Sequence, residues 1–298
     1  MPLEPHTAME LSSSRATILV VLILVSFIYV RGWRGVRKAR VNNIPIWRAA
    51  SFLFGVSLIW AALCSPLAEF DHDLLTVHMI QHLLLMTFAP ALILLGEPLL
   101  AFWHGLSRFG QDMVGLLFQV PFVQRFARTV TRPALCWTVS ALTLMAWHIP
   151  ELFMLGMHSA VWHSIEQASF LVAGLFFWWP VVQAWPSNAT GPQWSTLLYL
   201  FLATLPCDIL SGFLVFSDRV AYPVYLSMPR HFGFSVLEDQ QCAAALMWTC
   251  VTLFYLVPAA ILSTRLLSPR GCYTSGLVQS ELCRNTAADR NSQSLEAV

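Results

Sequence analysis

Long apolar runs separated by short polar segments dominate this chain. Seven of these runs are long enough, or nearly so, to cross a hydrocarbon core of about 30 Å as helices. The first is short, about 22 Å by helical rise, and needs a flanking turn to cross fully. The pattern predicts an all-α membrane bundle of seven transmembrane helices, at Ala16–Val30, Trp47–Leu63, Leu74–Leu95, Pro133–Trp147, His163–Val182, Trp194–Val215 and Gln240–Thr264.

The segments outside these runs complete the predicted organisation. Residues 1–15 are expected to form an extracytoplasmic N-terminal segment, followed by the seven-helix domain over residues 16–267. Residues 268–298 are rich in Ser, Asn and Arg, which predicts a disordered cytoplasmic tail. Between the third and fourth spans, two amphipathic pieces, Leu99–Leu106 and Met113–Phe126, are expected to lie along the membrane interface.

Composition supports a polytopic membrane protein that forms one bundle. The chain is 57% hydrophobic and 11% charged, with a mean hydropathy of +0.62, whereas a soluble domain carries roughly 25% charged residues. The 7 cysteines show no CxxC pair and no regular spacing, which disfavours a disulfide framework or a structural zinc site. A net charge of +1 and the lack of a basic, aromatic-interleaved segment give no indication of nucleic-acid binding.

Basic residues predict how the chain is oriented in the membrane. If the basic loop RGWRGVRKAR after the first span is cytoplasmic, every Lys and Arg except Arg15, Arg219 and Arg230 falls on that side. This distribution follows the positive-inside rule and predicts an outer N-terminus and a cytoplasmic C-terminus. Histidines sort the opposite way, since all but His104 lie at or near the predicted outer face. The outer side is therefore expected to be rich in metal ligands.

The third span carries the most informative histidines. His78 and His82 are four residues apart, so they stack on one face of a helix. At about 100° per residue, Asp71 and Met86 fall on the same side and Met79 flanks it. Imidazole, thioether and carboxylate groups on one stripe of a membrane helix are costly, and they indicate a functional site. Two structural histidines bonded to neighbouring carbonyls are the alternative.

Two further histidines are expected near the same level of the membrane. His148 follows the fourth span at Trp147-His148-Ile149-Pro150, where it is either a ligand or part of an interfacial anchor. The fifth span begins at His163, and its spacing places Glu166 on the same face, where the carboxylate could orient the imidazole. A purely structural Glu–His pair is the alternative. The predicted metal ligands are His78, His82, His148 and His163.

Several other side chains are candidates for an accessory role around this site. Asp208 follows Pro206 near the middle of the sixth span, where it could balance an ion or proton, or cap the break that the proline makes. Asp239 precedes the seventh span, where it also favours the helix dipole. The complete accessory set is Asp71, His72, Met79, Met86, His158, Glu166, Asp208 and Asp239.

The ligand types narrow the choice of metal. Imidazole with thioether suits copper, and thioether suits Cu(I) in particular. Haem b held between two histidines is a competing interpretation, and the scarcity of clustered carboxylates disfavours magnesium and calcium. No nucleophile with base and orienter, and no phosphate-binding glycine loop, stands out in the sequence, so an enzyme is not expected.

Four blocks of sequence resemble one known family. The runs HMIQHLLLMTFAPALILLGEP (78–98), WHIPELF (147–153), HSIEQASFLVAGLFFWWP (163–180) and EDQQCAAALMW (238–248) are similar to the CtaG family of cytochrome c oxidase assembly factors, of the multi-spanning bacterial type. The resemblance covers roughly residues 45–265. It departs from the family pattern at Ala91, where a second proline is expected, and at Ala244, where glycine is common.

The resemblance carries its own expectations. It implies a seven-helix protein of the bacterial plasma membrane that helps to assemble a haem-copper oxidase, through copper delivery or maturation of the copper centre, with oxidase subunits as partners. The residues in the matching blocks are His78, His82, His148, His163, Glu166 and Asp239. A membrane copper transporter or resistance protein, and a haem-b electron-transfer protein, are the alternative functions.

Overall fold

The computed structural model describes residues 5–39, 45–182, 193–229 and 233–267, and every regular element in these ranges is a helix. The predicted tail, 268–298, lies outside the described residues. Three short elements interrupt the α-helices: the 3₁₀ turns η1 (Pro66–Glu69) and η3 (Pro223–Ser227), and the π-helical turn η2 (Leu84–Phe88). The α-helices are α1 (Pro5–Ala39), α2 (Ile46–Cys64), α3 (Leu75–Leu83), α4 (Ala89–Leu95), α5 (Pro98–Gly105), α6 (Arg108–Gln119), α7 (Pro121–Val130), α8 (Pro133–Trp147), α9 (Pro150–His158), α10 (Ala160–Val182), α11 (Gln193–Phe216) and α12 (Val236–Leu267).

The helices identify a multi-pass membrane protein. Six stretches of the described residues are long and apolar enough to cross a membrane: Arg15–Lys38, Ile46–Glu69, Leu75–Leu95, Ala160–Val182, Trp194–Phe216 and Val236–Thr264. Helices α8 and α9 pass the same test only as a pair, and they are bent by 73° relative to each other. The predicted count of seven spans is reached only if this bent pair is one span. The predicted orientation of the bundle stays a prediction.

Two sequence-based predictions about local structure are wrong. The basic run after the first span is not a loop, because α1 continues as a helix to Ala39. Arg and Lys are good helix formers, and at a helix C-terminus their charges favour the helix dipole. The predicted amphipathic piece Met113–Phe126 is two helices, α6 and α7, broken at Pro121. Proline lacks an amide hydrogen and disfavours helical geometry in the preceding residue, here Val120.

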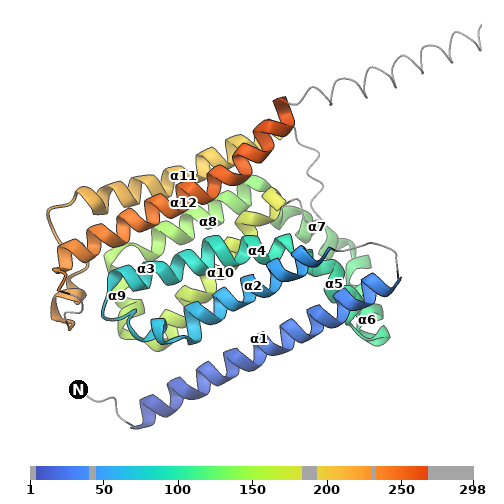
Figure 1. Ribbon diagram of the computed structural model, residues 1–298, viewed down its shortest axis with the longest axis horizontal. Coiled ribbons are helices and arrows are strands. Elements are labelled where there is room, and N and C mark those ends of the chain that lie inside the picture. The colour runs from blue at the N-terminus through green and yellow to red at the C-terminus, as the bar shows by residue number, and fades with distance from the viewer. Residues whose placement is uncertain (1–4, 40–44, 183–192, 230–232, 268–298) are drawn as a thin grey trace, which may run out of the picture.

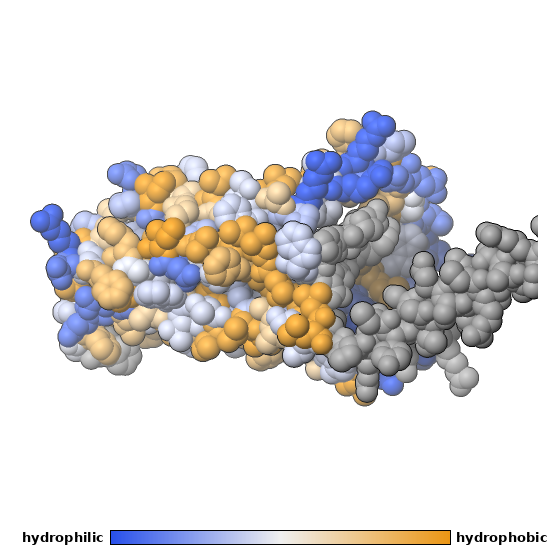
Figure 2. All heavy atoms as spheres, turned by 90° about the horizontal axis from the view of Figure 1, so that it is seen from above, coloured by the Kyte–Doolittle hydropathy of each residue, from blue (hydrophilic) through white to orange (hydrophobic). Residues whose placement is uncertain are grey.

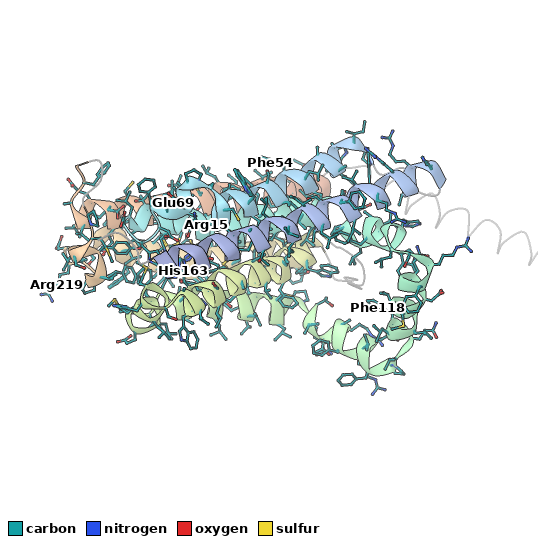
Figure 3. The ribbon with its side chains drawn as sticks, turned by 90° about the horizontal axis from the view of Figure 1, so that it is seen from below. Arg15, Phe54, Glu69, Phe118, His163 and Arg219 are labelled. Atoms are coloured by element: carbon teal, nitrogen blue, oxygen red, sulfur yellow. The ribbon has the colours of Figure 1, made fainter. Side chains whose placement is uncertain are left out.

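The bundle has two chemically different ends (Figure 1). The link before α3, helix α9 and η3 lie at one end, which we call the histidine end, while the C-terminus of α1 and helices α5–α7 lie at the other, the basic end. Figure 2 shows mostly hydrophobic residues along the middle of one face and hydrophilic ones concentrated toward the ends. In Figure 3, His163 and Arg219 lie toward the histidine end, and Phe118 lies on the hairpin of α6 and α7 at the basic end.

The third span forms the centre of the bundle. It runs without a gap through α3, η2 and α4, and 67% of its most apolar window is buried inside the protein, compared with 11% to 39% for the other five spans. Helices α2, α10 and α12 all pack against it. The polar side chains of His78, Gln81, His82 and Thr87 on this span are therefore buried inside the protein.

A wider turn interrupts the third span. The Ala89 amide donates to the Leu84 carbonyl, five residues earlier, which is the π-helical pattern. Pro90 follows and has no amide hydrogen to offer the Met86 carbonyl four residues before it. Gly174 of α10 lies against that carbonyl so closely that a Cβ at this position would overlap it. The regular 100° step used to place Met86 beside the histidines therefore does not hold beyond Leu83.

We expect Gly32→Ala to destabilise the packing of α1 against α5. A Cβ at Gly32 would overlap the Ala101 carbonyl, which is backbone and cannot rotate away. Close approach of membrane helices depends on such small residues, and overpacking typically costs about 1–3 kcal/mol. Thermal unfolding of the detergent-purified protein measures the effect. Gly212→Ala in α11 is the matched control, since a Cβ there meets nothing within 4 Å among the described residues; equal stability of the two variants would contradict the expectation.

Candidate metal centre

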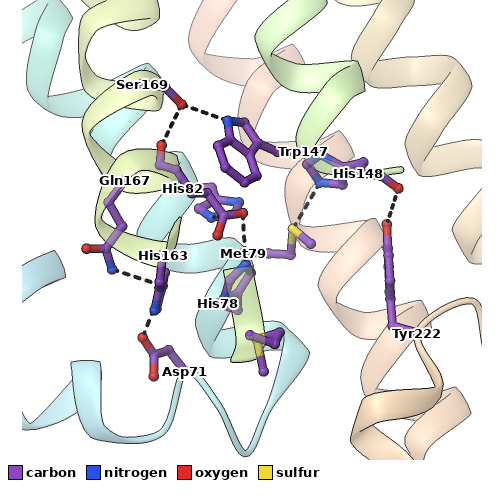
Figure 4. A network of polar contacts seen from close by, with 12 residues as sticks. Asp71, His78, Met79, His82, Trp147, His148, His163, Gln167, Ser169 and Tyr222 are labelled. Carbon is purple, nitrogen blue, oxygen red and sulfur yellow. Dashed lines mark hydrogen bonds and ion pairs between the residues drawn. The ribbon is translucent and has the colours of Figure 1, made fainter. Parts of the chain in front are cut away.

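Four segments bring the candidate ligands together at the histidine end (Figure 4). Helix α3 carries His78 and His82 on one face, and α10 carries His163 and Glu166. The link before α3 supplies Asp71 and His72, and His148 lies at the break between α8 and α9. All of these side chains except that of His72 are buried. The structure groups them into two clusters, with His148 beside them.

The inner cluster consists of His78, His82 and Glu166. Oε1 of Glu166 lies 3.6 Å from Nε2 of His78 and 3.4 Å from Nε2 of His82. One ligand atom from each residue lies within 4.8 Å of the others. Both ring nitrogens of each histidine, and Oε1 of Glu166, are buried without a hydrogen-bond partner in the part of the chain that the structure describes.

This arrangement fits a metal ion. Buried polar atoms without partners are costly, and a buried carboxylate needs a cation, a proton or a hydrogen bond. Ligand atoms about 2.0–2.2 Å from a tetrahedral ion lie about 3.3–3.6 Å from each other. The two carboxylate–imidazole distances of 3.6 and 3.4 Å match this separation, and they are too long for good hydrogen bonds. The inner cluster therefore suits an ion bound by His78, His82 and Glu166.

The outer cluster consists of Asp71, His72 and His163. Oδ2 of Asp71 lies 3.6 Å from Nε2 of His163, and Oδ1 of Asp71 lies 3.8 Å from Nε2 of His72. These three residues also bring one ligand atom each within 4.8 Å of the others. The imidazole of His163 stacks on that of His78, with 5.6 Å between ring centroids, so the two clusters are neighbours.

His148 stands beside the inner cluster and is already held by its own partners. Its Nδ1 lies 2.8 Å from the Leu144 carbonyl, and its Nε2 lies 3.4 Å from the sulfur of Met79. The Tyr222 hydroxyl donates to the His148 carbonyl at 3.1 Å. The ring centroids of His148 and His82 are 6.1 Å apart. The four predicted ligands are thus close together, but His78 and His82 share their cluster with Glu166, and His163 shares its cluster with Asp71.

Asp239 has a clear structural partner. Its carboxylate accepts hydrogen bonds from the amides of Leu75 and Thr76, at 2.7 and 3.1 Å, and from the Thr76 hydroxyl at 2.6 Å. The first amides of a helix have no partners within that helix. Asp239 of α12 therefore caps α3, the helix that carries His78 and His82.

The other accessory candidates lie in different surroundings. His158 is exposed and its Nδ1 contacts the Met154 carbonyl at 2.7 Å. Met86 and His82 line a cavity of about 50 Å³, whose walls also include Cys207 and Met247. Asp208 lies on α11 with its Oδ1 buried and without a hydrogen-bond partner among the described residues. Neither His158 nor Asp208 belongs to the two clusters.

Comparison with known proteins identifies the family. The model of the cytochrome c oxidase caa3 assembly factor family (Caa3_CtaG) matches residues 27–268. The chain belongs to this family. The match covers both clusters and the second to seventh predicted spans, and it includes only the last residues of the first predicted span.

The curated relatives of this CtaG-family chain are longer than the chain itself. It is 24% identical over 251 residues to an uncharacterized protein of Mycobacterium leprae, covering 78% of this chain and 36% of the relative. It is also 22% identical over 253 residues to uncharacterized proteins of Mycobacterium bovis and Mycobacterium tuberculosis, covering 82% of this chain and 37% of each relative. The chain thus spans just over a third of the length of these relatives. No solved structure matches it.

Several residues that shape the site in this CtaG-family chain are not evident from the sequence. Gly156 lies in α9, a helix that was not predicted, and a Cβ there would come within 2.8 Å of Oε2 of Glu166. Phe170 and Phe153 pack against the rings of His82 and His78, with centroids 4.1 and 5.1 Å apart. The sequence signal for α9 is Pro150, because proline favours the first position of a helix as well as ending the helix before it.

Tyr225 of η3 closes the site from the loop between α11 and α12. Its hydroxyl donates to the Asp71 backbone carbonyl at 3.2 Å. Burial, reinforced by the carboxylates of Asp71 and Asp239, raises the pKa of Tyr225 well above its ordinary value. The phenol therefore stays protonated and keeps its role as a donor. This contact fixes the backbone beside the outer cluster and could not be foreseen, because 154 residues separate the two partners.

Proposed function

We propose that this protein assists the assembly of a cytochrome c oxidase by binding copper at the inner cluster and delivering it to an oxidase subunit. The observation that carries the proposal is the convergence of His78, His82 and Glu166 with their ligand atoms unpartnered. Membership of the caa3 assembly factor family supplies the assembly role. The expected location is a bacterial plasma membrane, and the expected role is that of an assembly factor and not of an enzyme.

The surroundings of the inner cluster favour copper among the transition metals. Imidazole suits copper in both oxidation states, and thioether favours Cu(I). The sulfur of Met79 lies 3.4 Å from Nε2 of His148, and Met86 and His82 line the same cavity. Glu166 supplies the negative charge that a cation needs in an apolar setting. Bound there, the ion would be held by His78, His82 and Glu166, while Phe153 and Phe170 exclude water from the rings.

Metal analysis of the purified protein tests the site. We expect about one copper ion per chain in the inner cluster of the wild type, and loss of that ion in the double variant His78→Ala plus His82→Ala, because two of three ligands are removed. The protein is purified in detergent, loaded with copper, washed and measured by elemental mass spectrometry. The control is His104→Ala, a histidine of α5 at the basic end. Unchanged copper in the double variant would refute the proposed site.

Two measurements distinguish the proposal from its alternatives. A haem-b protein would show an intense Soret band and, when reduced, a sharp α band, whereas a copper site without haem would show neither. A porphyrin between two of these histidines would also require Phe153 or Phe170 to move, since both rings already pack on the imidazoles. For copper transport, cells without the protein would change their total copper. Assembly predicts normal total copper and loss of oxidase activity.

A further inference from the structure

We propose that Asp71, His72 and His163 form a second metal site, an entry site that takes up a cation from water and passes it to the inner cluster. This inference rests on the proposed function, because it supplies the route by which the inner cluster is loaded. The outer cluster offers two imidazoles and one carboxylate, the same ligand types as the inner cluster. First-row transition cations bind such a set well.

The outer cluster has the features of a built site. Its three ligand atoms lie within 4.8 Å of each other. Asp71 is 4% exposed, yet its Oδ1 has no hydrogen-bond partner among the described residues. A buried carboxylate oxygen left unpaired costs free energy unless a cation is near it. The Gln167 amide lies 3.1 Å from Nε2 of His163, the nitrogen that faces Asp71, so an ion bound by this nitrogen would displace the Gln167 contact.

Exposure falls in steps from the outer to the inner cluster. The His72 side chain is 46% exposed, that of His163 is 11% exposed, and that of His78 is 1% exposed. His72 is therefore the ligand that meets water first. The rings of His72 and His163 are in edge contact, with 5.0 Å between centroids, and His163 in turn stacks on His78 at 5.6 Å. The imidazoles thus form a continuous path into the protein.

The chemistry of the transfer is a ligand exchange. An ion leaving Asp71 and His72 for Glu166 and His78 exchanges one carboxylate and one imidazole for groups of the same kind. The ion keeps its oxidation state, so no electron donor or acceptor is needed. One carboxylate in each cluster balances charge at both positions, and this avoids an uncompensated buried cation during the step. His163 and Glu166 lie one turn apart on α10, so one helix presents ligands to both clusters.

The rate of copper uptake tests the entry site. Purified metal-free protein is mixed with Cu(I) held by the coloured chelator bicinchoninate, and loss of the chelate colour reports both the rate and the number of ions bound. We expect two ions per chain for the wild type. His72→Gln should bind one ion, at the inner cluster. It should take up this ion at least about tenfold more slowly, which is the lower end of the roughly 10–100-fold losses that follow from changing residues behind metal ligands. His78→Ala plus His82→Ala should bind one ion rapidly.

His158→Gln is the matched control, because His158 is also exposed at the histidine end but belongs to neither cluster. It should load like the wild type. Wild-type rate and stoichiometry in His72→Gln would overturn the entry site and leave the proposed function intact. Loss of all copper in either the His72 variant or the double variant would also overturn it, because the clusters would then act as one site. A wild-type protein that binds no copper would overturn both proposals.

Discussion

Glu166→Gln is expected to abolish stable copper binding and, with it, the maturation of the oxidase. Glu166 is the only carboxylate of the inner cluster and faces both His78 and His82 within 3.6 Å. Glutamine keeps the size of the side chain but removes the charge and one anionic oxygen. We expect an affinity loss greater than the roughly 10–100-fold that follows from removing a group behind the ligands. Copper content and oxidase activity in complemented cells are the measurements.

The stability of the metal-free Glu166→Gln protein separates a binding role from a structural one. Replacing a buried carboxylate, whose Oε1 has no hydrogen-bond partner among the described residues, by a neutral amide removes a desolvation cost. The metal-free variant should therefore unfold at the same temperature as the metal-free wild type, or higher, while copper stabilises only the wild type. Lower stability of the variant without metal would show that Glu166 serves the fold through His78 and His82.

Asp239→Ala is expected to destabilise the protein and to disturb the site from a distance. The change removes the carboxylate that caps α3, leaving the amides of Leu75 and Thr76 without their acceptor. The cap consists of these hydrogen bonds: a helix cap is worth about 0.5–2 kcal/mol in general, and each hydrogen bond to a charged group about 1.5–3 kcal/mol. We expect a total loss of about 2–4 kcal/mol, measured as thermal unfolding in detergent, together with weaker copper binding through the displaced His78.

Glu238→Ala is the matched control for the cap. Glu238 is the adjacent acid but bonds only locally, accepting from the Ser235 amide at 2.8 Å on the exposed face of α12. Its removal should leave copper binding unchanged and cost much less stability. Asp239→Asn should recover part of the stability, because its amide oxygen still accepts a hydrogen bond. Equal effects of Asp239→Ala and Glu238→Ala would mean that the cap does not position α3.

The sequence predicted the parts of the structure that depend on short-range patterns. The apolar runs located the spans, and α8 has the predicted bounds, Pro133–Trp147. The four-residue spacing of His78 and His82, and the three-residue spacing of His163 and Glu166, hold because both pairs lie on regular helix. The interpretation of Glu166 as a partner of His163 alone was incomplete. Its carboxylate also lies against His78 of α3. This contact depends on how α10 is rotated about its axis, which a single sequence does not show.

The parts that were missed depend on contacts between distant residues. The position of Asp239 in the sequence indicates a role at the dipole of its own helix, but its carboxylate caps α3 by accepting from Leu75, 164 residues earlier in the chain. Gly156 looked unremarkable because only the fold shows that Glu166 occupies the space where its Cβ would be. The charges of the run after Val30 indicate a membrane boundary and so favour a loop, but the run is helical to Ala39. Charge decides where a helix leaves the membrane, but not where it ends.

The cap from α12 also sets an order of events during synthesis. Asp239 belongs to the last of the described spans, so the ribosome delivers it after every ligand of both clusters has been made. Until that span inserts, the leading amides of α3 lack their acceptor, a situation that a bilayer penalises strongly. A nascent chain that lacks α12 therefore lacks the contact that fixes the start of α3, the helix that carries His78 and His82. If the inner cluster binds copper as proposed, the ion would be held firmly only after α12 has inserted.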